Sequence, residues 1–193
     1  MDGSKIIEGI KAGDKNSFDE LYDKYYLMLF RTAYLILGNS YDAEDVTQDA
    51  FVSIYVNIKS LKDPDKLKPW MFSILKNSAY KKYKNKKREL PDEEIQLKVD
   101  KETYTIEDEF VVKSEIQDAL MSLNKKQREV IVLFYYNDLT IKEIASALGV
   151  FEGTVKSRLF KARKVLKKEL EHSNESFLIE REGIYEKRLE SKF

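Results

Sequence analysis

Cationic side chains gather in two separate stretches of this sequence, and each stretch has the chemistry to bind a polyanion. Residues 62–88 hold ten basic and two acidic side chains, and residues 152–171 hold seven basic and three acidic ones. Such groups attract phosphates and displace their counterions. The whole chain is neutral, with 34 basic and 34 acidic side chains, so the charge is segregated. The pattern indicates contact with a nucleic acid at two places; a merely solubilising surface is the alternative.

The second cationic stretch belongs to a pair of expected helices joined by a glycine turn. Thr140 and Glu143 have the spacing of a capping box, and apolar residues recur at helical spacing as far as Gly149. A second helix is expected over residues 152–169. Its buried face would hold Val155, Leu159, Ala162 and Leu166. This is the helix-turn-helix pattern, whose second helix enters the DNA major groove; a helical hairpin with a solvated basic face is the alternative.

The first cationic stretch ends in KNSAYKKYKNKKR, where two tyrosines alternate with lysines. Cations hold the phosphate chain while aromatic rings stack on unpaired bases, so this segment is a candidate for binding single-stranded nucleic acid. A helix is expected from Trp70 to about Lys87, after a proline-containing loop over residues 60–69. We interpret Trp70 as a core residue rather than a stacking platform. Alternatively, the lysines gather here only because the dipole of a helix favours cations near its C-terminus.

A third group of polar residues lies on another expected helix, over residues 42–58. Asp45, Gln48 and Asp49 fall at i, i+3 and i+4 and so form one ridge, away from the face expected to be buried. That buried face would hold Ala43, Val46, Ala50, Ile54 and Ile58. A solvated acidic face at a helix N-terminus is one reading of the ridge. Acid–base catalysis is disfavoured because no His, Cys or Lys lies nearby in sequence.

The elements that must position these residues are expected to be helices throughout, because the chain has only 7 glycines and 3 prolines. A short first helix would end at Gly13. A second would begin with a capping box of Ser17 and Glu20 and end at Gly38. Asn124 and Gln127 have the same capping spacing further along the chain.

The fold class is therefore predicted to be all-α, with two small helical domains. Helical periodicity lapses over residues 89–106, which we interpret as a flexible linker. It would join an N-terminal helical bundle over residues 1–88 to a C-terminal helix-turn-helix domain over residues 107–171, followed by a tail over residues 172–193. The sequence has no cysteine and no apolar run of membrane-spanning length, and we expect a cytoplasmic protein without membrane insertion of its own.

The segment DAEDVTQDAF, the later PWMFSILKN and the C-terminal GTVKSRL occur in this order. Together they resemble the RNA polymerase sigma factors of the extracytoplasmic-function type, and the similarity covers roughly residues 17–88 and 115–170. The resemblance implies an alternative sigma factor without catalysis, cofactor or metal. Such a protein binds core RNA polymerase, recognises the −35 duplex of a promoter and captures the opened −10 strand. An anti-sigma factor is the further partner that it implies.

The resemblance also assigns roles to particular residues. Asp45, Gln48 and Asp49 would dock on a helical coiled coil of the largest polymerase subunits. The −10 strand would be read by Asp63, Asp65, Lys66, Lys76, Asn77, Tyr80, Lys81, Tyr83 and Lys84. The −35 duplex would be read by Gly153, Thr154, Lys156, Ser157, Phe160 and Lys161.

One position departs from the family pattern. Phe151 stands where relatives usually have a small polar cap, and we expect its ring to pack on Val155 as a hydrophobic staple. Arg158 and Arg163 are expected to contact phosphates or to pair within their domain.

The alternative function is a DNA-binding regulator that uses the same helix-turn-helix without joining the polymerase. It would require a dimer interface and a palindromic site, and it would leave the acidic ridge unexplained.

Overall fold

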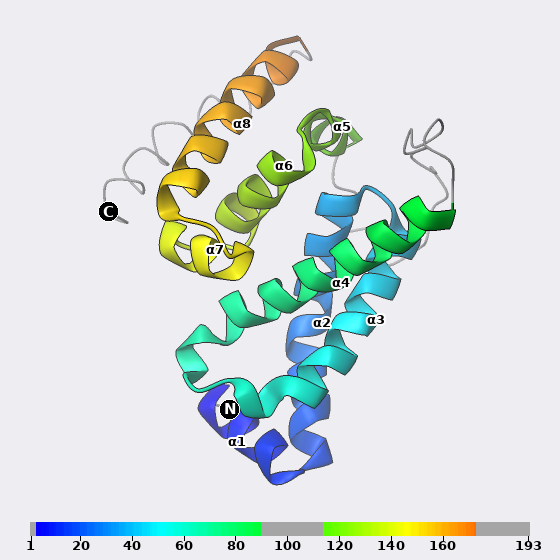
Figure 1. Ribbon diagram of the computed structural model, residues 1–193, viewed down its shortest axis with the longest axis vertical. Helices are drawn as coiled ribbons and strands as arrows, with labels where there is room; N and C mark the ends of the chain where they lie inside the picture. The colour runs from blue at the N-terminus through cyan, green and yellow to red at the C-terminus, as the bar shows by residue number, and fades with distance from the viewer. Residues whose placement is uncertain (1–2, 90–113, 173–193) are drawn as a thin grey trace. The chain divides into compact units, whose positions relative to one another are not determined.

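The computed structural model describes residues 3–89 and 114–172, and every secondary-structure element in these two ranges is helical (Figure 1). The all-α prediction is confirmed. The helices form two compact units, one built from α1–α4 and the other mainly from α5–α8. The linker expected over residues 89–106 and the tail expected over 172–193 fall almost entirely outside the described ranges. No described helix combines the length and hydropathy that a membrane span requires.

The N-terminal unit consists of α1 (Gly3–Ala12), α2 (Lys15–Leu37), α3 (Ser40–Asn57) and α4 (Leu67–Glu89). Two short 3₁₀ turns, η1 (Ile58–Ser60) and η2 (Pro64–Lys66), connect α3 to α4. Helix α2 packs on α1 and α3, α3 also packs on α4, and α1 contacts both short turns. All four helices contribute to one core, which includes Ile6, Ile7, Leu21, Leu29, Val46, Ile54 and Met71.

The ends of α2 show one correct and one wrong prediction. Gly38 ends the helix with a left-handed φ of 84°, as expected from its place after the apolar stripe. The start is wrong, because Asp14 and not Ser17 caps the helix. Asp14 accepts hydrogen bonds from the backbone N–H groups of Asn16 and Ser17 and from the Ser17 hydroxyl. The Ser17 hydroxyl lowers the pKa of Asp14; slight desolvation opposes this, and the two backbone donors reinforce it.

Helix α4 begins at Leu67, three residues before the predicted start at Trp70. Pro69 does not prevent this because it lies in the first turn, where a helix needs no backbone N–H donor. Leu67 and Met71 are buried, so the core extends into the segment predicted to be a loop. Trp70 itself is half-buried, which places it at the edge of that core.

The C-terminal unit consists of α5 (Ser114–Ser122), α6 (Lys125–Ile131), the π-helical turn η3 (Val132–Tyr136), α7 (Ile141–Leu148) and α8 (Glu152–His172). Helix α8 packs against α5 and α6. The two capping boxes predicted within this unit are both formed. Asn124 and Gln127 exchange hydrogen bonds at 3.0 and 3.3 Å, and Thr140 and Glu143 do so at 2.7 and 3.2 Å.

A buried guanidinium joins the end of α5 to α6. Arg128 donates to the carbonyl oxygens of Leu123 at 2.9 Å and Met121 at 3.2 Å. These carbonyls lie at the C-terminal end of α5, where a helix leaves acceptors without intrahelical partners. Burial lowers the pKa of Arg128, and the hydrogen bonds offset part of the desolvation.

Candidate nucleic-acid and protein interfaces

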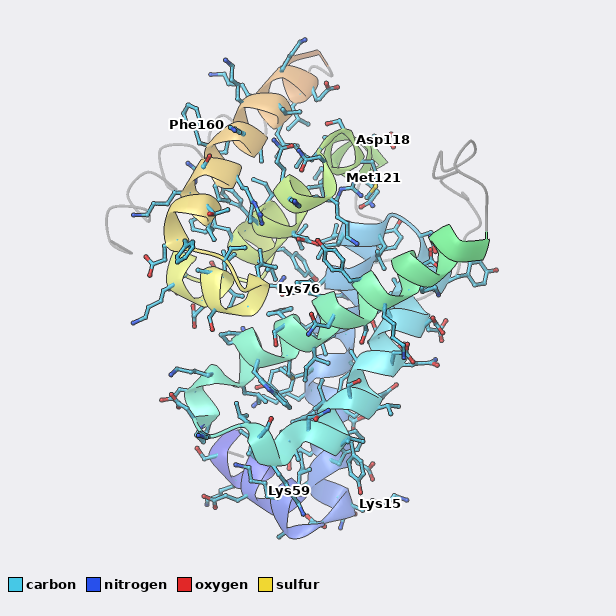
Figure 2. The ribbon with its side chains drawn as sticks, viewed as in Figure 1. Lys15, Lys59, Lys76, Asp118, Met121 and Phe160 are labelled. Atoms are coloured by element: carbon cyan, nitrogen blue, oxygen red, sulfur yellow. The ribbon has the colours of Figure 1, made fainter. Side chains whose placement is uncertain are left out.

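Helix α8 buries one face in its own unit and turns a polar face outward. Val155, Leu159 and Ala162 are buried, as the spacing predicted, but Leu166, the fourth residue of the predicted stripe, is only half-buried. Of the six residues predicted to face the −35 duplex, Thr154 is half-buried. The other five are exposed: Gly153, Lys156, Ser157, Phe160 and Lys161. At 100° per residue these five occupy an arc of roughly 140°, and Figure 2 shows Phe160 pointing away from α6.

The start of α8 is open. A Cβ atom added at Gly153 would meet no atom within 4 Å, so packing within the protein does not require glycine there. The Phe151 carbonyl accepts hydrogen bonds from the N–H groups of Thr154 at 2.9 Å and Val155 at 3.2 Å. The predicted staple is wrong, because the Phe151 side chain is 88% exposed while Val155 is fully buried. A ring that packed on Val155 would lose much of its exposed area.

Arg163 lies at the side of α8 and makes a contact within its own unit. Its Nε donates to the Tyr135 hydroxyl at 2.8 Å, and its guanidinium lies 5.9 and 5.7 Å from the ring centroids of Phe134 and Tyr135. Of the two roles expected for Arg163, the structure therefore supplies the intradomain pair. The contact fixes α8 against η3 through a cation–π interaction and a hydrogen bond.

The acidic ridge of α3 lies on the outside of the N-terminal unit. Asp45, Gln48 and Asp49 are all exposed, while the stripe on the other side of the helix is buried. The ridge continues into Val52, 65% exposed, and Val56, 69% exposed. The sequence reasoning missed these two residues, although their i+3 and i+7 spacing from Asp49 could have shown that they share its side of the helix.

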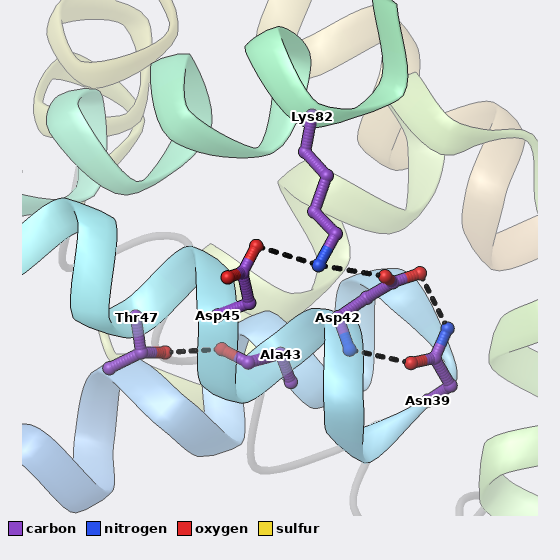
Figure 3. Close-up of polar contacts among 6 residues, drawn as sticks. All are labelled: Asn39, Asp42, Ala43, Asp45, Thr47 and Lys82. Carbon is purple, nitrogen blue, oxygen red and sulfur yellow. Dashed lines mark hydrogen bonds and ion pairs between the residues drawn. The ribbon is translucent and has the colours of Figure 1, made fainter. Parts of the chain in front are cut away.

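Lys82 of α4 reaches the N-terminal end of this ridge (Figure 3). Its Nζ lies 2.7 Å from Asp45 Oδ2 and 3.0 Å from Asp42 Oδ1. Asp42 is itself held by Asn39, which donates to the carboxylate at 2.7 Å and accepts from the Asp42 backbone N–H at 2.7 Å. Partial burial lowers the pKa of Lys82, but the hydrogen bonds to Asp45 and Asp42 outweigh it and the net shift is upward. One cation of the lysine run is thus paired with the acidic ridge.

The segment before α4 is anchored at both ends. Leu61 and Leu67 are buried, and Lys11 of α1 donates to the Leu61 carbonyl at 2.6 Å. Between them Asp63 accepts from the Asp65 N–H at 3.1 Å and pairs with Lys66 at 3.3 Å. Asp63 therefore organises this segment as well as being a candidate for base recognition. The side chains of Asp65 and Lys66 are exposed.

The candidate residues of α4 lie opposite its core face. Asn77, Tyr80 and Lys81 are exposed and fall within roughly 100° of the helix circumference. Leu75 and Ala79 are buried on the other side. Lys76 is half-buried. Two further predicted residues, Tyr83 and Lys84, have side chains outside the described part of the structure.

Comparison with known families identifies the two units. The family model "Sigma-70 region 2" matches residues 21–89, and "Sigma-70, region 4" matches residues 113–166. Helix α1 precedes both matches. The class of protein defined by the two helical units is therefore that of the sigma-70 factors.

Individual relatives narrow this class. The chain is 32% identical to the ECF RNA polymerase sigma factor SigW of Bacillus subtilis, over 86% of this chain and 95% of that protein. It is 33% identical to the ECF sigma factor SigM of Mycobacterium tuberculosis, over 92% and 89%. The crystallised sigma factor RpoE of Bartonella quintana, bound to the anti-sigma factor NepR, shares the fold with a TM-score of 0.67. Its identity is 24%, over 80% of this chain and 96% of that chain. The chain belongs to the extracytoplasmic-function (ECF) sigma factors.

Membership of this family settles the broad function. ECF sigma factors are transcription initiation factors and not enzymes, so the protein is an alternative sigma factor, as the resemblance of its motifs indicated.

Proposed function

We propose that this sigma factor directs initiation by holding three ligands on three separate surfaces. Asp45, Gln48 and Asp49 bind core RNA polymerase through its largest subunits. Helix α8 reads the −35 duplex in the major groove. The segment over residues 60–69 and the outer face of α4 hold the opened −10 strand.

The observation that carries the proposal is the outward face of α8. Five of its six candidate residues are exposed on one side, opposite the buried Val155, Leu159 and Ala162. Lys156 and Lys161 supply cations for phosphates or guanine acceptors, and Ser157 supplies a hydroxyl for hydrogen bonds. The space around Gly153 admits close approach of a ligand to the helix backbone. These properties suit a helix that lies in a groove of DNA.

For the −10 strand, the exposed group on α4 combines a ring with a cation. Tyr80 can stack on an unpaired base, a contact worth ~1–3 kcal/mol, while Lys81 lies on the same side for the phosphate chain. Among the residues before α4, Asp65 and Lys66 are exposed candidates for reading a flipped base. Melting requires no fuel if the exposed bases are held better than the duplex, because differential binding shifts the population.

For the polymerase, the outer surface of α3 offers acids followed by apolar side chains. Carboxylates at Asp45 and Asp49 can form charge-assisted pairs with arginines of a partner helix. Val52 and Val56 add apolar area on the same side. A partner helix that docks along the ridge would cover both valines and gain from burying them.

The proposed domain boundaries are residues 1–88 and 107–171. The proposed linker over residues 89–106 would span at most ~60 Å when fully extended, which sets the largest separation of the two promoter contacts. The protein would act in the cytoplasm, with the polymerase and the chromosome. The solved relatives RpoE and CnrH are bound to NepR and to the cytosolic domain of CnrY, and we propose an anti-sigma partner for this chain as well.

Transcription by core polymerase tests the proposal as a whole. Core enzyme mixed with this protein should yield run-off transcripts from a limited set of promoters, whereas a regulator would not supply initiation to bare core. The double variant Asp45→Ala/Gln48→Ala should lose core binding with unchanged circular dichroism. Asp23→Ala on α2 is the control, since it removes one exposed carboxylate from a different helix. Core binding that survives in the double variant would remove the ridge from the interface.

A further inference from the structure

Phe151 is an exposed aromatic residue at a position where the fold itself would favour a small polar one. It lies directly before α8, where Ser, Thr, Asp or Asn would cap the helix by accepting a backbone N–H. A phenyl ring accepts none; the Phe151 carbonyl does accept from the N–H groups of Thr154 and Val155, but a backbone carbonyl can do so whatever the side chain. The ring is also 88% exposed, so it contributes little to the core. Neither capping nor packing explains the side chain.

We propose that Phe151 determines sequence specificity by contacting the C5 methyl group of a thymine in the −35 duplex. The proposal rests on the proposed role of α8 as the helix that enters the major groove. In a helix-turn-helix the N-terminal residues of the second helix contact base edges. Phe151 lies two residues before Gly153, where the space beside the backbone is open.

The chemistry of the ring selects its ligand. Base edges in the major groove present hydrogen-bond donors, acceptors and one apolar group, which is the thymine methyl. Phenylalanine has no donor or acceptor in its side chain, so the methyl group is the feature that it can recognise. Glu152 beside it is acidic and exposed, which disfavours a phosphate at this position and leaves a base edge as the partner.

Phe160 is a second exposed ring on α8, and any base that it contacts must be a different one. The two residues are nine positions apart, which corresponds to ~13 Å along a helix. One methyl group therefore cannot touch both rings. This separation allows the role of Phe151 to be measured without interference from Phe160.

A cycle of protein and DNA substitutions tests the contact. Duplexes are first selected from a random pool with the full-length wild-type protein bound to core polymerase. Each thymine of the −35 element is then replaced singly by deoxyuridine, which pairs identically but lacks the methyl group. At one position the replacement should lower wild-type affinity about fourfold, the effect expected for one buried methyl group. The Phe151→Ser variant should bind the thymine duplex more weakly than the wild type does. Its affinity should be the same whether thymine or deoxyuridine stands at that position.

Serine at 151 also separates recognition from folding. Serine is a favoured capping residue, so Phe151→Ser should keep or raise the thermal midpoint while it loses the thymine discrimination. Phe151→Leu should retain part of the discrimination because leucine is apolar. Phe160→Ala serves as the comparison and should keep the deoxyuridine sensitivity assigned to Phe151.

Two results would overturn the proposal. If the wild-type protein selects a −35 element but no thymine couples to Phe151, α8 reads the duplex without this residue. If Phe151→Ser lowers the thermal midpoint, the ring is a structural residue. A wild-type protein that selects no −35 element would instead overturn the function proposed for α8, and the Phe151 contact with it.

Discussion

Replacement of Lys82 by alanine tests whether the protein's own lysine competes with RNA polymerase for the acidic ridge. Lys82 Nζ lies 2.7 Å from Asp45 Oδ2 and 3.0 Å from Asp42 Oδ1. A polymerase arginine that pairs with Asp45 must share this carboxylate with Lys82 or displace the lysine. Removal of the lysine should therefore strengthen the binding of core polymerase.

The magnitude follows from the exposure of the pair. The side chain of Asp45 is 58% exposed and that of Lys82 is 29% exposed, and solvated ion pairs contribute ~0–1 kcal/mol. Because a carboxylate has lone pairs for more than one donor, displacement need not be complete. The gain in polymerase affinity should therefore be about two- to fivefold. Salt should reduce the gain, since screening weakens interactions between exposed charges.

The stability of the N-terminal unit should change little. Asp42 keeps its hydrogen bonds with Asn39 when Lys82 is removed. The raised pKa of Lys82 means that its contribution to stability is present below pH 10.5 and is lost as the pH rises through the folded-state pKa. In strong alkali the free energy of unfolding of the wild type should therefore fall as Lys82 loses its proton. The Lys82→Ala variant should not show this loss.

The assay is a titration of labelled protein with core polymerase at low and at high salt. Lys81→Ala is the matched control, because it removes the same charge from the neighbouring exposed position. Equal effects of the two variants would show that net charge alone is responsible. Weaker binding by Lys82→Ala would refute competition and would mean that Lys82 orients Asp45 for the polymerase.

Three further substitutions test single contacts. Asp14 has a lowered pKa, so its stabilisation is present above pH 3.8 and is lost as the pH falls through the folded-state value; acid unfolding of Asp14→Asn should lack this component. Arg128→Met should lower the free energy of unfolding of the C-terminal unit by about 2–3 kcal/mol, measured by urea titration, because buried carbonyls including that of Leu123 lose their donor. Lys11→Met should speed hydrogen exchange in the segment after Leu61 about fivefold, whereas Lys5→Met, on an exposed side of α1, should not.

Helix ends were predictable where a single residue type satisfied the local geometry. Gly38 and Gly149 adopt left-handed conformations, with φ of 84° and 66°, and few other residues do so without strain. The start of α2 was not predictable in this way. Asp14 and Ser17 are both good capping residues three positions apart, and only the folded turn shows that Ser17 donates to Asp14.

Side-chain exposure was predictable from periodicity on the buried faces and less so at isolated positions. Three of the four residues of the buried stripe of α8 followed from spacing alone, whereas Leu166, near the end of the helix, is only half-buried. The staple expected at Phe151 did not form. The sequence shows that the ring is apolar, but it does not show whether the expected neighbour has exposed surface on which the ring can pack. Val155 is already fully buried.

Contacts between helices could not be derived from sequence. Lys82 and Asp45 are 37 positions apart, Lys11 and Leu61 are 50 apart, and Arg163 and Tyr135 are 28 apart. No local spacing encodes such a pairing, because it depends on the relative position of two packed elements. The lysines of α4 look alike in sequence, yet among the lysine side chains that the structure describes, the fold turns Lys82 toward α3.

The packing of α4 on α3 links two of the proposed surfaces. The buried core fixes these helices against each other, so their packing persists when a polymerase arginine takes Asp45 from Lys82. The opposite side of α4 carries Asn77, Tyr80 and Lys81, the proposed contacts to the −10 strand. A polymerase that grips the ridge of α3 therefore also fixes the orientation of these three residues. Because packed helices move as a unit, the strand-capturing face would be positioned by the same contact that recruits the protein.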